Sequence, residues 1–292
     1  MKTGKLAEAF CVENGKHFRL KDFDPADTGH WHSKEHAAEA LQDGVTRTSE
    51  LQDQLYAQDR WALLLIFQAM DAAGKDSAIK HVMSGVNPQG CQVHSFKQPS
   101  DQELQHNFLW RTTRDLPERG HIGIFNRSYY EEVLVVRVHP EALADEKLPE
   151  PLVDKKIWEH RLEDIACFEQ HMWRSGTVIR KFFLHVSRKE QKKRFLKRLE
   201  EPEKNWKFSA SDIHERKYWD EYQDAYEDAI RSTATKHAPW YVVPADNKWF
   251  SHLVISSVIV ETLESLNLSF PKVDAKERKE LEAAKKILLA KA

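Results

Sequence analysis

The sequence predicts an α/β fold in which a parallel sheet is covered by helices on both faces. One observation is a continuous apolar stretch of strand length at 61–67 (WALLLIF), which is typical of a strand buried on both sides. A second is the alternation of such stretches with segments of helical periodicity, which favours parallel pairing. A third is that no Pro- or Gly-rich linker, internal repeat or low-complexity tract divides the 292 residues. We therefore expect a single domain.

Each element follows from a local pattern. Apolar residues at helical spacing predict a helix over 33–58, and a glycine-containing turn after the first strand predicts another helix from about Lys75. Ser100 with Glu103 and Ser187 with Glu190 form capping boxes, which predict helix starts. Further strands are expected at 91–96, 121–126, 178–186 and 240–244. Further helices are expected at 100–114, 130–137, 151–175, 250–267 and 274–292.

Three segments are expected along the chain. Residues 1–32 lack clear periodicity, so they are predicted to form an N-terminal arm that lies over the domain or is partly loose. Residues 33–270 are expected to form the main domain, with a helical insertion at about 188–235. Residues 271–292 are charged and amphipathic and are expected to form a peripheral C-terminal helix.

Composition limits the class of protein. The formal net charge is −2, which does not favour a generally basic nucleic-acid binder. The three cysteines are far apart in the sequence and show neither metal-ligand spacing nor a disulfide framework. No apolar stretch approaches the roughly 20 residues that cross a bilayer, and the N-terminus does not resemble a signal peptide. We therefore expect a cytoplasmic protein without a membrane or nucleic-acid partner.

A candidate phosphate loop lies between the first strand and the next helix, at 68–77 (QAMDAAGKDS). Glycine lets backbone N–H groups converge on an anion, the helix N-terminus adds partial positive charge, and Lys75 adds a full one. The match to G-x-x-x-x-G-K-[ST] is incomplete, because Ala69 replaces the first glycine and Asp76 replaces the hydroxyl residue. The loop residues expected to contact phosphate are Ala72, Ala73, Gly74, Lys75, Asp76 and Ser77.

A carboxylate inside this loop, Asp71, would repel phosphate unless a cation neutralised it. Mg²⁺ is the natural candidate, with Asp71 as a direct or water-mediated ligand. Asp71 is alternatively placed to orient the attacking phosphate oxygen or to accept a proton from it. The plain alternative for the whole stretch is a strand–turn–helix junction in which Gly74 serves only the backbone.

The strand at 121–126 should deliver further polar residues to the same sheet edge, where ligands of such sheets bind. Asn126 can offer an oxygen to Mg²⁺, and Arg127 can bind phosphate oxygens with two hydrogen bonds. Glu131, one turn later, is a candidate for the nucleotide side or the metal shell, or is simply a favourable acidic residue at a helix start. Glu132 is expected to be such a solvated helix-start residue.

A basic segment at 180–207 contains eleven Lys or Arg and four Glu, an excess of seven positive charges. P-loop kinases place such residues on a mobile lid that closes over the transferring phosphoryl group. Arg188, Arg194 and Arg198 are therefore candidate phosphate-binding residues. The alternative is a solvated basic helix, which is the expectation for any single lysine of the segment.

Several long motifs occur in order along the chain: FQAMDAAGKDS (67–77), FLWR (108–111), IFNRSYYEEVLVVRVHP (124–140), KFFLHVSRKEQKKRF (181–195) and HAPWYVVPADNKWF (237–250). Together they resemble the polyphosphate kinase 2 family, over about residues 15–270. The resemblance implies a three-layer α/β/α P-loop kinase fold, similar to thymidylate kinase, with a helical lid. It also implies a homo-oligomer, either a dimer or a tetramer.

The same resemblance implies transfer of a phosphoryl group from inorganic polyphosphate to nucleotides, with Mg²⁺, and we expect Mn²⁺ to be a substitute for it. Asn126 and the continuation EEVLVVRVHP are similar to the class III branch, which phosphorylates AMP and ADP and thus forms ADP and ATP. Asp71 and Lys75 match the Walker A residues, Asn126 and Arg127 match the Walker B region, and Arg111 of FLWR is expected to contact substrate.

The reaction that we expect is direct in-line attack by the nucleotide's terminal phosphate oxygen, with Asp71, Lys75 and Arg127 as the catalytic residues. Phosphoryl transfer asks the protein mainly for positioning and charge stabilisation. Two other functions stay open at this point: an ATP-dependent nucleoside monophosphate kinase, and a non-catalytic protein that binds polyanions through its basic segment.

Overall fold

The computed structural model describes residues 6–290 and contains one six-stranded sheet in the order β1-β6-β5-β2-β4-β3. All neighbouring pairs are parallel except β1 with β6, which is antiparallel. The prediction of a parallel sheet is therefore confirmed for five strands. The sixth strand, β1, adds an antiparallel edge that was not expected. The strands are β1 (Cys11–Val12), β2 (Ala62–Gln68), β3 (Cys91–Ser95), β4 (Ile122–Asn126), β5 (Thr177–His185) and β6 (Trp240–Pro244).

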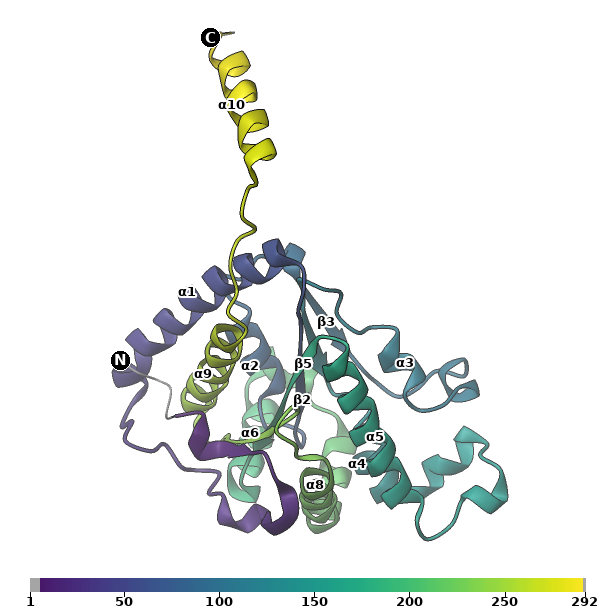
Figure 1. Ribbon diagram of the computed structural model, residues 1–292. Coiled ribbons are helices and arrows are strands. Elements are labelled where there is room, and N and C mark those ends of the chain that lie inside the picture. The colour runs from purple at the N-terminus through teal and green to yellow at the C-terminus, as the bar shows by residue number, and fades with distance from the viewer. Residues whose placement is uncertain (1–5, 291–292) are drawn as a thin grey trace.

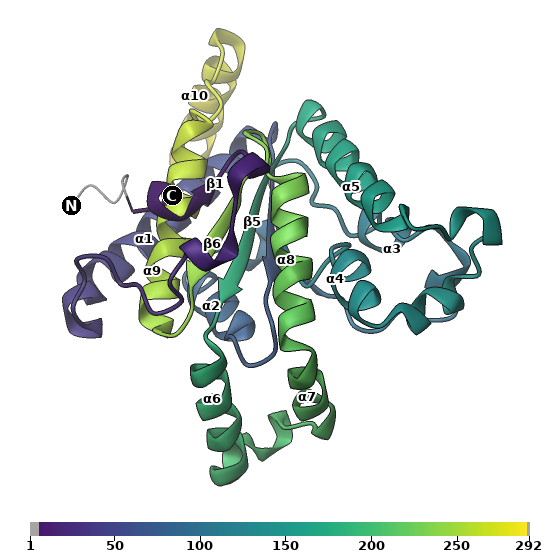
Figure 2. The same cartoon turned by 90° about the horizontal axis from the view of Figure 1, so that it is seen from below.

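Helices cover both faces of the sheet and give three layers (Figures 1 and 2). One layer contains α1 (Lys34–Gln58), α2 (Lys75–Val82) and α9 (Lys248–Ser265). The other contains α4 (Glu131–Val138), α5 (Ile157–Arg174) and α8 (Trp219–Thr233). β2 lies between the layers, and all seven of its residues are buried, as its uninterrupted apolar sequence predicts. The α/β/α architecture of the P-loop kinases is thus confirmed.

The N-terminal segment packs on this body. β1 pairs with β6, so that Cys11 lies opposite Tyr241, and Phe10, Phe18 and Leu20 are buried. This sixth strand was not expected from the sequence, because its two residues are too few to show a strand period. Residues 1–5 of the expected arm lie outside the described residues.

The helix expected at 100–114 is wrong. The capping box does form, since the Ser100 N–H donates to the Glu103 carboxylate at 2.7 Å. The chain then makes only a 3₁₀ turn over Glu103–Gln105 before α3 (Trp110–Thr113). Between them, the Asn107 side chain accepts the Leu109 N–H at 3.1 Å. Such a local side-chain bond competes with helical pairing, which explains the interruption.

The region 188–235 consists of two parts with different surroundings. α6 (Arg188–Glu200), a 3₁₀ helix at Pro202–Lys207 and α7 (Ala210–Glu215) extend beyond one end of the sheet (Figure 2). α8 instead packs against α4 and α5 and has seven buried residues. The part that extends beyond the sheet is therefore 188–215, which we call the lid segment.

The C-terminal helix α10 (Ala275–Ala290) projects away from the body at the end of the sheet opposite to the lid segment (Figure 1). All of its residues are exposed. The last two residues of the expected helix, 291–292, lie outside the described residues. Among residues 6–290, no helix combines the length and apolar character needed to span a membrane.

A buried ion pair connects β5 to the α5 layer. The Lys181 ammonium is fully buried and donates to the Glu169 carboxylate at 2.5 Å, to the Thr233 carbonyl at 2.8 Å and to the Tyr130 hydroxyl at 3.1 Å. Burial lowers the pKa of Lys181 and raises that of Glu169, and each partner opposes the shift of the other. Tyr130 immediately precedes α4, so this network fixes the start of that helix against β5.

We predict that Lys181→Met destabilises the fold by about 3–5 kcal/mol, because it leaves the Glu169 carboxylate buried without its cation. The double variant Lys181→Met/Glu169→Gln should lose less, since it removes both charges and keeps an acceptor for the tyrosine hydroxyls. Urea unfolding followed by circular dichroism measures both. Equal losses in the single and double variants would contradict the proposed role of the charge pair.

Candidate active site

The loop after β2 has the backbone geometry of a phosphate-binding loop. Gly74 has φ +112° and directly precedes α2, a conformation that residues with a Cβ rarely adopt. Ala72 also has positive φ, at 60°, which costs about 1–3 kcal/mol for a non-glycine residue. The Lys75 ammonium turns back over the loop and donates to the Ala69 carbonyl at 2.7 Å.

The strained loop is held from outside by α6. Arg194 is only 8% exposed, and its guanidinium donates to the carbonyls of Ala72 at 3.1 Å and Ala73 at 2.6 Å. It also donates to the carbonyls of Ala245 and Asp246, which follow β6. A second side chain of α6, Gln191, donates to the Asp71 carbonyl at 3.0 Å. Side chains of the lid segment thus donate hydrogen bonds to backbone carbonyls of the phosphate loop, which are neutral acceptors.

β4 brings Asn126 and Arg127 to the same edge of the sheet. Parallel pairing places Asn126 beside Phe67, and the Asn126 amide donates to the Asp76 carboxylate at 2.8 Å. Arg127 has φ 66°, and its guanidinium lies 3.4 Å from Asp71 and 4.0 Å from Glu131. These pairs are long, so Arg127 is available for a bidentate contact with a phosphate.

Burial and mutual charge shift the pKa values of this group. Desolvation, followed by the neighbouring Arg127 charge, lowers the pKa of Lys75, and Asp71 opposes that shift. Desolvation raises the pKa of Glu131, against the effect of Arg127 and Lys75. The Glu131 carboxylate in turn is the main cause of a raised Arg127 pKa. Perturbed titratable groups that share a cleft are typical of a functional site.

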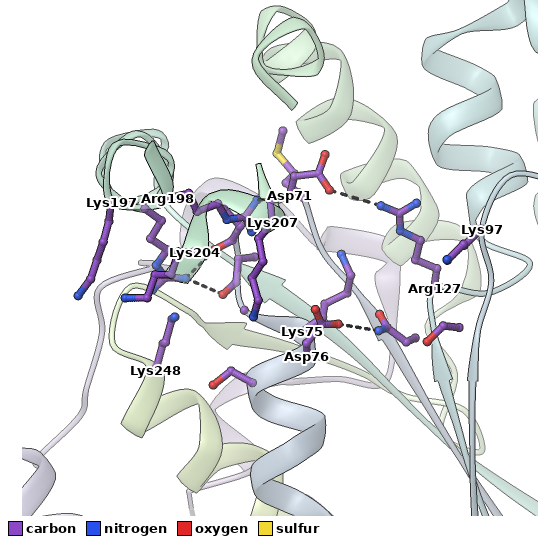
Figure 3. Close-up of a pocket in the computed structure, with 18 of the residues that line it drawn as sticks. Asp71, Lys75, Asp76, Lys97, Arg127, Lys197, Arg198, Lys204, Lys207 and Lys248 are labelled. Carbon is purple, nitrogen blue, oxygen red and sulfur yellow. Dashed lines mark hydrogen bonds and ion pairs between the residues drawn. The ribbon is translucent and has the colours of Figure 1, made fainter. Parts of the chain in front are cut away.

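A cavity of about 520 Å³ opens above the phosphate loop. Nine basic and two acidic side chains line it, and Figure 3 shows that they converge from the phosphate loop, the ends of β3 and β4, α6, the following 3₁₀ helix and α9. The basic ones are Lys75, Lys97, Arg127, Arg194, Lys197, Arg198, Lys204, Lys207 and Lys248. Such a concentration of cations fits a polyanion.

A second cavity, of about 450 Å³, lies on the other side of Asp71 and Arg127. It is mixed in charge, with four basic and five acidic side chains, and is also lined by Tyr222 and Tyr226. Met70, Asp71, Lys97 and Arg127 line both cavities. The two spaces therefore meet at the pair Asp71–Arg127, where a group bound in one would face a group bound in the other.

Most residues expected at the site do meet there. Asp71 through Ser77, Asn126, Arg127, Arg194 and Arg198 line the first cavity, and Glu131 and Arg111 line the second. Arg198 is also paired with Asp212 of α7 at 3.0 Å. Arg188 is exposed and lines neither cavity; its carbonyl accepts a bond from Arg216.

Sequence reasoning missed several lysines of the first cavity. Lys97 follows β3 and Lys248 begins α9 just after β6. The rule that ligands bind beyond the carboxyl ends of strands would have pointed to both. Lys204 and Lys207, in the 3₁₀ helix after α6, lay inside the segment recognised as basic but were not singled out.

The residues present fit a magnesium ion shared with a substrate. No group of three or more His, Cys, Asp or Glu side chains within residues 6–290 could hold a metal alone. Mg²⁺, however, is usually bound by one or two carboxylates together with water and phosphates. Asp71 and Asp76 border the first cavity, and the Asn126 amide nitrogen is engaged with Asp76, which leaves its oxygen unused by that bond.

We predict that Arg194→Lys destabilises the protein by about 1–3 kcal/mol, because an ammonium cannot replace all five hydrogen bonds of the guanidinium. The loop strain at Ala72 should then be less well supported, so kcat should fall as well. Lys192→Ala, an exposed position on the same helix, serves as the control in urea unfolding and turnover assays. Unchanged stability in Arg194→Lys would contradict the structural role.

Comparisons with known proteins agree with this geometry. The family model described as polyphosphate kinase 2 (PPK2) matches residues 31–271. The chain is 57% identical to an ADP-polyphosphate phosphotransferase of Rhodopseudomonas palustris, covering 91% of this chain and 95% of the relative. It is 44% identical to an AMP/ADP-polyphosphate phosphotransferase of Meiothermus ruber, covering 92% and 97%.

Among solved structures, the polyphosphate kinase 2 of Arthrobacter aurescens TC1 is similar to the whole fold. The TM-score is 0.87 at 38% sequence identity, and the match covers 98% of this chain and 96% of the other. The fold, the phosphate loop and the family model thus all indicate the same family. The chain belongs to the polyphosphate kinase 2 family.

Proposed function

We propose that the protein transfers a phosphoryl group from inorganic polyphosphate to AMP and ADP, forming ADP and ATP. The observation that carries this proposal is the pair of cavities that meet at Asp71 and Arg127, one strongly basic and one mixed in charge. The relatives from Rhodopseudomonas palustris and Meiothermus ruber, named for transfer between polyphosphate and ADP or AMP/ADP, support the same reaction.

The basic cavity suits the donor. Polyphosphate carries a negative charge on each unit, and two unit charges about 4 Å apart repel by about 4 kcal/mol at an effective dielectric of about 20. Bringing its end to a nucleotide phosphate therefore requires many cations. The first cavity provides nine, several of them on the lid segment.

The mixed cavity suits the acceptor. A nucleoside phosphate has an anionic end and a neutral, planar end, so its site needs cations at one end only. Lys97 and Arg127 lie where the two cavities meet, and the remaining wall includes Val135, Val136 and Tyr226. A volume of about 450 Å³ is within the usual range for small-molecule sites.

In the proposed reaction, an oxygen of the acceptor's terminal phosphate attacks the terminal phosphorus of polyphosphate. A new P–O bond forms in line with the bridging P–O bond that breaks, and the donor leaves one unit shorter. Lys75 and Arg127 stabilise negative charge on the transferring group, and Asp71 orients the attacking oxygen. Mg²⁺, held by Asp71 with Asp76 or Asn126, would neutralise phosphate charge when bound.

We further propose that Mn²⁺ can replace Mg²⁺, that the protein assembles into a dimer or tetramer, and that it is located in the cytoplasm. Each has a direct measurement: metal replacement in the assay, light scattering of the purified protein, and cell fractionation.

The donor decides between this function and an ATP-dependent kinase. We expect AMP to be converted to ADP and ATP with polyphosphate and Mg²⁺, and only slowly to ADP when ATP replaces polyphosphate. Lys75→Ala and Asp71→Asn should each reduce kcat by about 10²-fold or more, because they act on charge in the transition state. Lys192→Ala should leave it unchanged. Faster turnover with ATP than with polyphosphate would refute the proposed donor.

The lid lysines should bind the donor without assisting the chemical step. Lys197 and Lys204 lie at the end of the first cavity that is far from Arg127 (Figure 3). We predict that Lys197→Ala/Lys204→Ala raises KM for polyphosphate several-fold, with kcat and the KM for AMP unchanged.

The matched control for this pair is Lys189→Ala/Lys192→Ala, which removes the same charge from exposed positions of α6 outside the cavity. Steady-state kinetics with long-chain polyphosphate measures both pairs. An equal rise of KM in the two would mean that only the general charge of α6 matters.

A further inference from the structure

A cluster of two arginines and two glutamates lies at the wall of the acceptor cavity. Glu132 of α4 is the centre, with Arg111 of α3 at 3.5 Å and Arg161 of α5 at 3.6 Å. Arg161 is also paired with Glu146 at 2.5 Å. Side-chain exposure is 6% for Glu132 and 6% for Arg111. The expectation that Glu132 is solvated is wrong, because α4 turns this side chain inward between α3 and α5.

The carboxylate of Glu132 has no hydrogen-bond donor among residues 6–290. Both arginine distances exceed the 2.7–3.2 Å of N–H···O bonds. The arginines are used elsewhere: Arg111 donates to the Lys97 carbonyl at 2.7 Å, and Arg161 donates to the Glu132 carbonyl and to Glu146. A buried carboxylate that accepts no hydrogen bond is costly and calls for an explanation.

The pKa of Glu132 reflects this position. Desolvation raises it to about 7, and Glu146 and Glu131 act in the same direction, whereas Arg111 and Arg161 oppose the shift. Near neutral pH, an N–H donor at the carboxylate would favour its charged, accepting form. The group thus has an unused capacity to accept a hydrogen bond.

Glu132 faces space that a ligand can enter. It lines the acceptor cavity, and it also lines a smaller adjoining cavity of about 80 Å³. Arg111, Pro99 and Val136 line the same two spaces. At another part of the acceptor cavity, the Tyr222 hydroxyl already donates to Glu215 at 2.7 Å. Glu132 is therefore a carboxylate that borders the acceptor cavity, has ion pairs at 3.5 and 3.6 Å but no hydrogen-bond donor within the described part of the chain, and can accept a bond from a ligand there.

We propose that Glu132 accepts a hydrogen bond from the exocyclic amine of the acceptor's nucleobase, with Arg111 as an ion-pair partner of the carboxylate at 3.5 Å. This inference rests on the proposed function, because it assumes a nucleotide in the second cavity. An ionised carboxylate only accepts hydrogen bonds, so it favours a base with an amino group at this edge, such as adenine. A purine without the amine would leave the carboxylate without this hydrogen bond. Sites built to bond a polar group of the substrate discriminate strongly against analogues that lack it.

The first test uses the unaltered enzyme. We compare kcat/KM for AMP and for purine riboside 5′-monophosphate, in which hydrogen replaces the amine, with polyphosphate and Mg²⁺. Loss of a hydrogen bond to a charged group should lower kcat/KM roughly 10-fold to 100-fold. If both nucleotides are phosphorylated and their kcat/KM values agree within about twofold, recognition of the amine is refuted and the proposed function stands. No turnover of either would refute the proposed function itself.

The second test assigns the effect to Glu132. Glu132→Met should lower kcat/KM for AMP to near that of the analogue, so that the preference falls to about threefold or less. Glu163→Gln, an exposed carboxylate on α5, should keep the full preference. A full preference in Glu132→Met would show that another residue recognises the amine. Circular dichroism checks folding, and if the Met variant is misfolded, Glu132→Gln with its neutral carbonyl acceptor should show a reduced preference.

Discussion

The parallel register of β2 with β4 is the constraint on which the site depends. It places Phe67 beside Asn126, so the phosphate loop and the Asn126–Arg127 turn begin at the same level of the sheet. The hydrogen bond between Asn126 and Asp76 and the contact between Arg127 and Asp71 both follow from that alignment. A shift by one residue would turn Asn126 to the opposite face and separate these partners. Catalytic geometry is therefore set by the buried strands, whose sequences are almost entirely apolar.

Positive charge at the site has two separate uses. The Arg194 guanidinium donates hydrogen bonds to backbone carbonyls of the phosphate loop and of the turn after β6. It therefore supports a strained loop. Arg127 and Lys248 border the cavity without such backbone bonds, and Lys75 makes only one, to the Ala69 carbonyl, which leaves two of its N–H donors. A charge count along the sequence treats these residues alike. Only the side-chain contacts show which cations hold the protein together and which remain available for an anion.

The sequence was sufficient for the five parallel strands, the phosphate loop and the α/β/α layers, because buried strands and capped helices leave strong local patterns. It was insufficient where a local bond or a distant segment decided the outcome. Asn107 interrupts the expected helix after Ser100 through its own side chain, and β1 is too short to have a period. Lys97 and Lys248 reach the cavity from segments about 150 residues apart, which no local pattern could join. Glu132 lies buried where α3 and α5, which are distant in the sequence, each bring an arginine to it.

The difference in charge between the two cavities accounts for the carboxylate inside the phosphate loop. In a site built from cations alone, two anionic substrates would compete for the same groups, and nothing would fix which one lies on which side. Asp71 stands at the boundary, where it repels phosphate that is not accompanied by a cation, and Arg127 lies across from it at 3.4 Å. The basic cavity can then retain a long polyanion, while the mixed cavity favours a molecule with one charged end. Selection between donor and acceptor thus follows from the distribution of charge around one loop residue.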